Sequence, residues 1–400
     1  MFKEFAIKNF RTHIDTKLPV QDIALVIGSN NSGKSNLLAA VQHFSGLIKR
    51  ANPDENNPHE NRILKKNDLF PHRHRLHTDK PMEFLCTWEN KYGNIEYHIS
   101  VFNNRDKIVC IETINIIEKK GSTKKIVTTE NEQINLRTQL EHENIDDNKK
   151  RLARDFFRDL ASIYYFNFQP ALLKGDIKYQ GETPKPDTLR IASQLGKEGG
   201  NLQNIIKIIY EHEKGVYDKF VLLLRKFVDS FYGISIKDGN IYWQFDLNRV
   251  PPKPEEFPAH VVSDGLLKAA AIALLASMDN PPSLIMLEEI ENGINQKNIQ
   301  HLINWLSKIT GRGYTTQVIA TTHSPSILRE FAENLDRVFY VALLPKGFKS
   351  VVSDLNALLI NDMKAGRIDG DIVEIDGKEL VKVEPLELIK LFYMGIIGGI

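Results

Sequence analysis

The segment from Gly28 to Asn36 constrains the fold of this chain more than any other stretch. Its letters, GSNNSGKSN, match the pattern G-x-x-x-x-G-K-[ST], a loop whose backbone N–H groups cradle phosphate groups. The apolar run at residues 23–27 precedes this loop and predicts a buried parallel strand. Four apolar residues then recur at helical spacing, at Leu37, Val41, Phe44 and Ile48. Strand, loop and helix follow in the order that phosphate binding requires, so we predict a nucleoside triphosphate site.

Each residue type in this loop has a physical role. Glycine permits close backbone approach, the helix N-terminus adds a positive dipole, Lys34 supplies charge, and Ser35 can ligate Mg²⁺. The loop residues that we expect to contact the nucleotide are Gly28, Asn30, Asn31, Ser32, Gly33, Lys34, Ser35 and Asn36.

The composition narrows the function classes. The 400 residues include 52 Lys and Arg against 51 Asp and Glu, so no overall basic field indicates nucleic acid. Cys86 and Cys110 lie in strand-like runs without CxxC spacing, and we expect half-buried reduced thiols rather than a disulfide or metal pair. The chain opens on a strand-like run rather than a signal peptide, and no apolar stretch approaches bilayer length. We therefore expect a cytoplasmic protein with no membrane contact.

Periodicity organises the first half of the chain. Residues 51–80 lack periodicity and hold four histidines, which predicts an exposed, solvated basic loop rather than a metal site. Residues 81–136 alternate with period two, which predicts an antiparallel meander inserted after the first helix. Residues 137–163 then predict a helix, and residues 164–168 predict a strand.

The second half changes from helices to alternating elements. Residues 201–232 predict helices, residues 233–247 a short β segment, and residues 251–258 a Pro-rich loop. From residue 260 onward, helices at 266–277 and 298–309 alternate with apolar strands at 284–287 and 318–321. This alternation indicates right-handed parallel crossovers.

We therefore predict an α/β fold with a mixed or parallel sheet core, an antiparallel β lobe and a helical subdomain. The expected divisions are a first lobe with the phosphate loop and the meander (1–136), a helical subdomain (137–258), a second lobe (259–340) and a C-terminal subdomain (341–400).

Two carboxylates end the apolar strand at 284–287. In nucleotide hydrolases an acidic residue at such a strand end holds the Mg²⁺ shell, and a neighbouring carboxylate can orient or deprotonate the attacking water. Adjacent strand residues point to opposite faces, so we assign Glu288 to Mg²⁺ and Glu289 to the water. The strand at 318–321 is followed by His323, whose imidazole could donate a hydrogen bond to the terminal phosphate.

The segment Ser263-Asp264-Gly265 opens an Ala-rich helix. Ser and Gly at a helix N-terminus make either an ordinary N-cap or an anion site, and periodicity does not separate the two.

Taken together, these pieces resemble ABC-type ATPases of the RecF, SMC and Rad50 kind, specifically the compact bacterial group that includes the ATPase part of OLD-family proteins. The segments that carry the resemblance are, in chain order, Ile7–Arg11 (IKNFR), Gly28–Asn36, Gly199–Leu202 (GGNL), Ser263–Gly265 (SDG), Leu287–Gly293 (LEEIENG) and Thr322–Pro325 (THSP). The resemblance covers most of the chain, and the joint order of the motifs is far more specific than any one of them.

The chain departs from the family pattern in places. Ile290 replaces the usual proline, and Glu288 stands where ABC proteins usually have Asp; we expect neither change to abolish hydrolysis. Gln169 is our candidate for the glutamine that joins the two lobes and reaches the metal. The sequence shows no zinc-hook cysteines and no long coiled-coil arms, which argues against Rad50 or true SMC proteins. We interpret Asp369-Gly370-Asp371 as a turn in a terminal subdomain rather than part of a Toprim nuclease.

The resemblance implies that two protomers sandwich two ATP molecules. Lys34 and Ser35 of one protomer would meet Ser263 and Gly265 of the other across the γ-phosphate, which gives an isologous two-fold contact. The N-terminus of the Ala-rich helix would then serve ATP that is bound to the partner.

The resemblance also implies roles for the remaining motif residues. Glu289 would activate water, His323 would sense the γ-phosphate, and Arg11 would contact the nucleotide. Hydrolysis removes the shared ligand, so the state of ATP becomes dimer geometry.

Three hypotheses remain for what the protein does with ATP in the cell. The first is an ATP-gated sensor or scaffold in a bacterial anti-phage or toxin-type defence system, with a separate effector such as a nuclease or toxin. The alternative is a RecF-like repair clamp, in which basic segments at 149–158 and 62–75 contact duplex DNA, although acidic neighbours dilute the first segment. The third is nucleotide binding without turnover, against which the intact Glu289 and His323 count.

Overall fold

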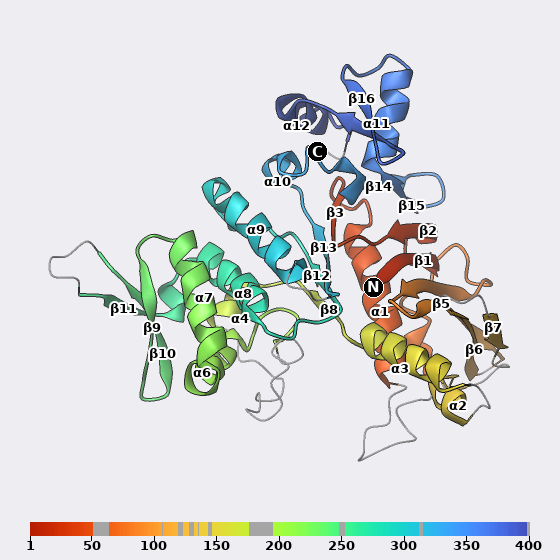
Figure 1. Ribbon diagram of the computed structural model, residues 1–400, viewed down its shortest axis with the longest axis horizontal. Coiled ribbons are helices and arrows are strands. Elements are labelled where there is room, and N and C mark those ends of the chain that lie inside the picture. The colour runs from red at the N-terminus through yellow and green to blue at the C-terminus, as the bar shows by residue number, and fades with distance from the viewer. Residues whose placement is uncertain are drawn as a thin grey trace. The chain divides into compact units, whose positions relative to one another are not determined.

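The computed structural model describes residues 1–50, 64–105, 107–118, 123–127, 132–134, 136–142, 146–175, 195–247, 253–311 and 315–397. The chain forms two units, one of which joins both of its ends (Figure 1). The first unit holds Met1–Ile163 and Ala332–Ile400, and the second holds Tyr164–Phe331. The phosphate loop therefore belongs to the first unit, and the double-glutamate strand belongs to the second.

An antiparallel sheet of six strands dominates the first unit. Its strands, in the order β2-β1-β4-β5-β6-β7, are β2 (His13–Pro19), β1 (Phe2–Phe10), β4 (Met82–Glu89), β5 (Gly93–Asn104), β6 (Lys107–Glu118) and β7 (Thr123–Val127). Burial alternates along β4, where Met82, Phe84, Cys86 and Trp88 point inward. The predicted meander is thus confirmed, and the opening hairpin β1–β2 extends it because β1 pairs with β4.

Two helices contact the apolar face of this sheet, α1 (Lys34–Arg50) and α3 (Asp147–Ala161). A third helix, α2 (Leu136–His142), packs against α3. Phe44 of α1 stacks on Phe84 and Tyr97, and Phe156 and Phe157 of α3 meet Tyr97 edge-on. Such aromatic pairs add to the free energy gained from burial, so this cluster fixes α1 on the sheet.

A second set of strands in the first unit carries the phosphate loop. The buried strand β3 (Ile23–Ile27) lies parallel to β14 (Val338–Leu344), which pairs antiparallel with β15 (Lys349–Asp354). The chain then ends in α11 (Leu355–Lys364), the hairpin of β16 (Asp371–Ile375) and β17 (Lys378–Lys382), and α12 (Pro385–Tyr393).

The second unit packs helices around a short parallel pair. Strand β12 (Leu284–Leu287) lies parallel to β13 (Gln317–Thr321), and β8 (Ile163–Phe166) follows next to β12. The helices are α4 (Pro170–Lys174), α6 (Leu202–His212), α7 (Lys214–Phe227), α8 (Asp264–Ser277), α9 (Ile299–Thr310) and α10 (Pro325–Arg329). A small sheet completes the unit, with β9 (Phe231–Lys237), β10 (Asn240–Phe245) and β11 (Glu255–Pro258).

Helix α8 is the centre of this unit. Every residue from 266 to 277 is buried, and α8 contacts α4, α7 and α9. A helix that is apolar on all sides is expected at such a buried position. These elements confirm the predicted mixed α/β fold with an antiparallel β lobe and helices, while the expected divisions at 136, 258 and 340 stay predictions.

Several local predictions are wrong. Helix α3 ends at Ala161, so Ile163 belongs to β8, and residues 255–258 form a strand instead of a loop. The segment 64–81 is not simply exposed, because Leu69 and His74 are buried within the first unit. Both cysteines are free and fully buried rather than half-buried. Residues 51–63, the first part of the expected loop, lie outside the described residues.

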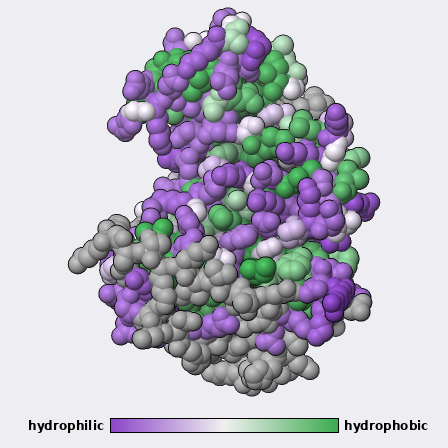
Figure 2. All heavy atoms as spheres, turned by 90° about the vertical axis from the view of Figure 1, so that its right-hand side faces the viewer, coloured by the Kyte–Doolittle hydropathy of each residue, from purple (hydrophilic) through white to green (hydrophobic). Residues whose placement is uncertain are grey.

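The surface carries both hydrophilic and hydrophobic residues. The face in Figure 2 is largely hydrophilic with scattered hydrophobic groups. Across the described part of the chain, no helix combines the length and the apolar character needed to cross a membrane.

Asn9, the asparagine of the IKNFR segment, has a structural role in the opening strand β1. It is buried at a φ of +57°, a left-handed conformation that Asn tolerates better than most residues. Its side-chain Nδ2 donates to the carbonyl groups of His77, Lys80 and Pro81, at 3.0, 2.8 and 3.2 Å. This one side chain therefore fastens the segment 77–81 to β1.

We predict that Asn9→Ala lowers the free energy of unfolding by about 3 kcal/mol, because carbonyl groups lose their donor and Ala is strained at positive φ. Chemical denaturation measures the change. The control is Asn94→Ala, at an exposed position on β5, which should change stability by less than about 0.5 kcal/mol. Equal effects from both variants would contradict the role given to Asn9.

Candidate functional site

The phosphate loop connects β3 to α1 through an unusual backbone. Gly28, Asn31 and Gly33 have φ values of +153°, +63° and +111°. A Cβ on Gly33 would clash with the Ser350 hydroxyl, and one on Gly28 would clash with the Val341 carbonyl. Glycine is therefore required at both motif positions by packing as well as by conformation.

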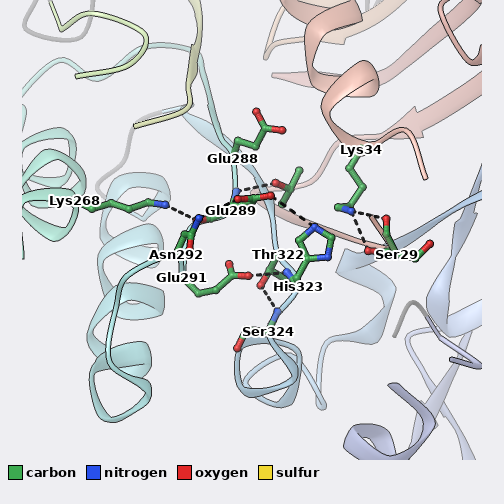
Figure 3. Close-up of polar contacts among 12 residues, drawn as sticks. Ser29, Lys34, Lys268, Glu288, Glu289, Glu291, Asn292, Thr322, His323 and Ser324 are labelled. Atoms are coloured by element: carbon green, nitrogen blue, oxygen red, sulfur yellow. Dashed lines mark hydrogen bonds and ion pairs between the residues drawn. The ribbon is translucent and has the colours of Figure 1, made fainter. Parts of the chain in front are cut away.

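Side chains bind the carbonyl groups of this loop. Lys34 is 6% exposed, and its Nζ donates to the carbonyl oxygens of Gly28 and Ser29, each at 2.9 Å (Figure 3). The Ser350 hydroxyl donates to the Ser32 carbonyl at 2.7 Å. The ring Nε2 of His13 lies 3.0 Å from the Gly33 carbonyl and must donate to it, because a carbonyl only accepts.

The loop fits a phosphate group. The Ser32 hydroxyl is buried and has no hydrogen-bond partner among the described residues. Helix α1 begins at Lys34, so the N–H groups of its first turn and the positive end of its dipole face the loop. An anion with several acceptor oxygens matches this set of donors.

A basic cavity adjoins the loop in the first unit. Arg11 donates to Asn36 at 3.1 Å, and Asn36 donates to Thr12 at 3.0 Å. Arg11 and Thr12 also line a cavity of about 550 Å³, whose other lining residues are Pro71, Arg73, His74, Arg75, Leu76 and Phe348. Three arginines beside apolar groups suit an anionic ligand that also has a flat apolar part.

The two glutamates after β12 have different surroundings. Glu288 is 7% exposed, and its carboxylate accepts a hydrogen bond from the Tyr165 hydroxyl. The Glu289 side chain is 42% exposed, and its carboxylate accepts from Asn292 at 3.1 Å. The strand ends at Leu287 and Glu289 has a φ of +45°, so the separation of the two carboxylates comes from a turn and not from strand alternation.

His323 lies beside Glu289 in the second unit (Figure 3). Its Nε2 is 3.8 Å from the Glu289 Oε1, and its backbone N–H donates to the Glu291 Oε1 at 2.7 Å. The other oxygen of Glu291 is buried without a hydrogen-bond partner in the described part of the chain. Glu289 and His323 are thus brought together as a half-exposed acid–imidazole pair.

Helix α8 contributes an ammonium group that sequence reasoning missed. Lys268 is 7% exposed, and its Nζ donates to the Glu289 carbonyl at 2.6 Å. Burial lowers the pKa of Lys268 to about 8, and the nearby Glu291, Glu289 and Glu288 oppose this shift. The sequence feature that could have indicated this group is the single lysine in a helix whose other buried residues are apolar or small.

The remaining predicted residues have ordinary local partners. The Ser263 hydroxyl accepts from the Leu266 N–H at 3.3 Å, which is an N-cap of α8. Gln169 is exposed at the N-cap position of α4, and its amide donates to Asn167 at 3.2 Å. The nucleotide role of Ser263 and the metal role of Gln169 stay predictions.

We predict that His13 makes stability depend on pH. Burial lowers the pKa of His13 to about 4 in the folded protein, whereas an unfolded histidine titrates near 6.5. Between these values the unfolded state binds more protons, so the free energy of unfolding falls as the pH falls. From pH 7 to pH 5 the loss from this group is about 2 kcal/mol.

Chemical denaturation at the two pH values compares the wild type with His13→Gln, whose amide can still donate to the Gly33 carbonyl but does not titrate. The variant should lose about 2 kcal/mol less on acidification. The exposed His212→Gln is the control and should follow the wild type. An unchanged pH dependence in His13→Gln would refute the assignment.

Known proteins resemble this chain over both units. Residues 1–219 match the family model of the AAA ATPase domain, and residues 242–329 match the model described as AAA domain, putative AbiEii toxin, Type IV TA system. An ATP/GTP phosphatase of Helicobacter pylori is 24% identical over 348 residues, which are 84% of this chain and 88% of that protein.

Solved structures give a more distant likeness. The SMC head domain from Thermotoga maritima has a TM-score of 0.40 at 15% identity, over 88% of this chain and 98% of that one. An Smc head domain with an extended coiled coil, bound to the C-terminal domain of ScpA from Pyrococcus furiosus, has a TM-score of 0.43 at 13% identity, over 92% and 99%.

The family matches agree with the motif order and with the geometry of the phosphate loop. They confirm the predicted ATPase, while the narrower likeness to OLD-family proteins stays a prediction. Because the first match spans more than half of the residues, the chain belongs to the AAA ATPase domain family.

Proposed function

We propose that this protein binds ATP with Mg²⁺, hydrolyses it, and uses the ATP-bound state to hold two protomers together. The observation that carries the proposal is the environment of Glu289, a half-exposed carboxylate beside His323 whose backbone is fixed by neighbouring side chains. A general base needs an accessible carboxylate in a fixed position, and this arrangement supplies both.

The loop residues bind the triphosphate in this scheme. The Lys34 ammonium lies inside the loop, where it exchanges the Gly28 and Ser29 carbonyl groups for phosphate oxygens. Ser35 and Glu288 are hard oxygen donors of the kind that Mg²⁺ takes, with Gln169 as a third candidate. Bound Mg²⁺ would neutralise part of the phosphate charge. Arg11, beside Asn36, would contact the nucleotide from the basic cavity.

The second unit supplies the groups for hydrolysis. Glu289 accepts a proton from the attacking water, and His323 donates a hydrogen bond to the terminal phosphate. Ser263 and Gly265 would act on ATP held by the partner protomer, since they open a helix of 14 residues whose N-terminus attracts anions.

For the output, we propose a nucleotide-gated sensor or scaffold of a bacterial, cytoplasmic defence system that acts on a separate effector, such as a nuclease or toxin. The match of residues 242–329 to a model whose description names a putative toxin and a toxin–antitoxin system supports this direction.

A DNA-repair clamp is the alternative. Arg73 and Arg75 in the basic cavity favour it, because they could neutralise phosphates. The basic helix α3 favours it less, since Lys149 pairs with Asp146 and Arg158 pairs with Asp155. Arg62 of the second basic segment lies outside the described residues.

We predict that Glu289→Gln lowers the ATP turnover number by about 100-fold or more while ATP still binds, because the amide cannot accept the proton. Turnover and light-scattering mass should be measured with Mg²⁺-ATP, with and without duplex DNA. The variant should accumulate as a dimer or larger assembly in ATP. The matched control is Glu211→Gln, at an exposed position on α6.

Normal hydrolysis by Glu289→Gln would refute the role of this carboxylate. A mass that does not change with ATP would refute the dimer. Salt-sensitive stimulation by DNA would favour the repair clamp over the scaffold.

A further inference from the structure

The peptide groups that flank Glu289 are held from two sides. Its N–H donates to the Thr321 hydroxyl at 2.9 Å, and its carbonyl accepts from the Lys268 Nζ at 2.6 Å. Asn292 adds a hydrogen bond to the carboxylate. These partners come from β13, α8 and the turn after β12, so three separate segments fix one residue (Figure 3).

This fixation opposes a conformational cost. Glu289 has a φ of +45°, which is unfavourable for a residue with a Cβ. Residues in such conformations persist only where the surroundings over-determine them, and they cluster at functional sites. Without the ammonium on its carbonyl, Glu289 would gain access to other backbone conformations.

Burial of the Lys268 side chain is energetically unfavourable. A fully buried lysine is rare, and an apolar side chain of similar length would avoid the loss of hydration. The rest of α8 from Leu266 onward is apolar or small and buried. The contact to Glu289 is therefore what a lysine adds here that a methionine could not.

The same helix also contacts the turn beyond Glu289. A Cβ on Gly265 would clash with the Gly293 carbonyl, so the first turn of α8 lies directly against this turn. Gly293 itself has a φ of +80°. Helix α8 thus meets the segment 289–293 at two points, one turn apart, and begins at Ser263–Gly265.

We propose that Lys268 is a positioning residue, which fixes Glu289 for hydrolysis and connects it through α8 to the ligand state of Ser263–Gly265. This inference rests on the proposed function, in which Glu289 accepts the proton and Ser263 meets the partner's ATP. A ligand at the start of α8 then changes the orientation of Glu289 in the same protomer, and the two ATP sites of the dimer become coupled.

Steady-state ATPase kinetics test the proposal with Lys268→Met, Lys268→Arg and Glu289→Gln in one assay. We expect Lys268→Met to lower kcat 10- to 100-fold with KM within about 3-fold, because the lysine acts through the backbone of Glu289. Lys268→Arg keeps a donor and should recover kcat to within about 5-fold of wild type. The control is Lys219→Met, at a surface lysine of α7 paired with Asp279, which should match the wild type.

A double-mutant cycle tests the connection to the start of α8. Ser263→Ala should lower kcat by a smaller factor beside Lys268→Met than in the wild-type background, because the part of its effect that passes through Glu289 is then already lost. Independent, multiplicative effects would overturn the coupling.

The outcomes distinguish a failure of the positioning role of Lys268 from a failure of the proposed function. If Glu289→Gln is inactive while Lys268→Met has a wild-type kcat, the positioning role is wrong and the proposed function stands. If Glu289→Gln hydrolyses normally, the proposed function fails first. Thermal unfolding shows whether Lys268→Met folds; if it does not, Lys268→Gln replaces it, and failure of Lys268→Arg to exceed that variant overturns the proposal.

Discussion

The carbonyl groups of the phosphate loop impose the constraint on which the first unit depends. A loop that turns N–H groups toward a ligand must turn carbonyl groups toward the protein, and buried carbonyls need donors. Here the donors are Lys34 within the loop, His13 on β2 and Ser350 on β15. The loop is therefore held by both the antiparallel sheet and the strands next to β3, which explains why the two chain ends share one unit.

The parts of the fold that could be predicted are those with a local pattern. The strands at 23–27 and 284–287 have the predicted bounds, because a buried parallel strand is a continuous apolar run with polar limits. The sequence did not predict the strand at 255–258, because this short segment beside prolines becomes a strand only by pairing with β10. The local sequence does not show that pairing. Likewise the ring Nε2 of the buried His74 lies within hydrogen-bond distance of the Phe348 carbonyl, 274 residues away, and no local pattern shows this contact.

The candidate site divides in the same way. Lys34, Ser35, Glu288, Glu289 and His323 are predicted from motifs, because the proposed chemistry needs those residue types at fixed spacing. Their supports, His13, Ser350 and Lys268, are not, since each acts on a backbone carbonyl that is far away in sequence. A carbonyl is present at every residue, so no spacing in the sequence shows which one a side chain will reach.

The phosphate loop and the segment around Glu289 are therefore stabilised in the same way. In the phosphate loop and at Glu289, side chains bind backbone carbonyls, and the backbone in turn positions the groups that would act on the ligand. This arrangement leaves the Glu289 carboxylate half-exposed, because most of the restraint is on its peptide groups and Asn292 alone donates to the carboxylate among the hydrogen bonds described above. Backbone restraint thus fixes the position of the residue while its carboxylate stays accessible.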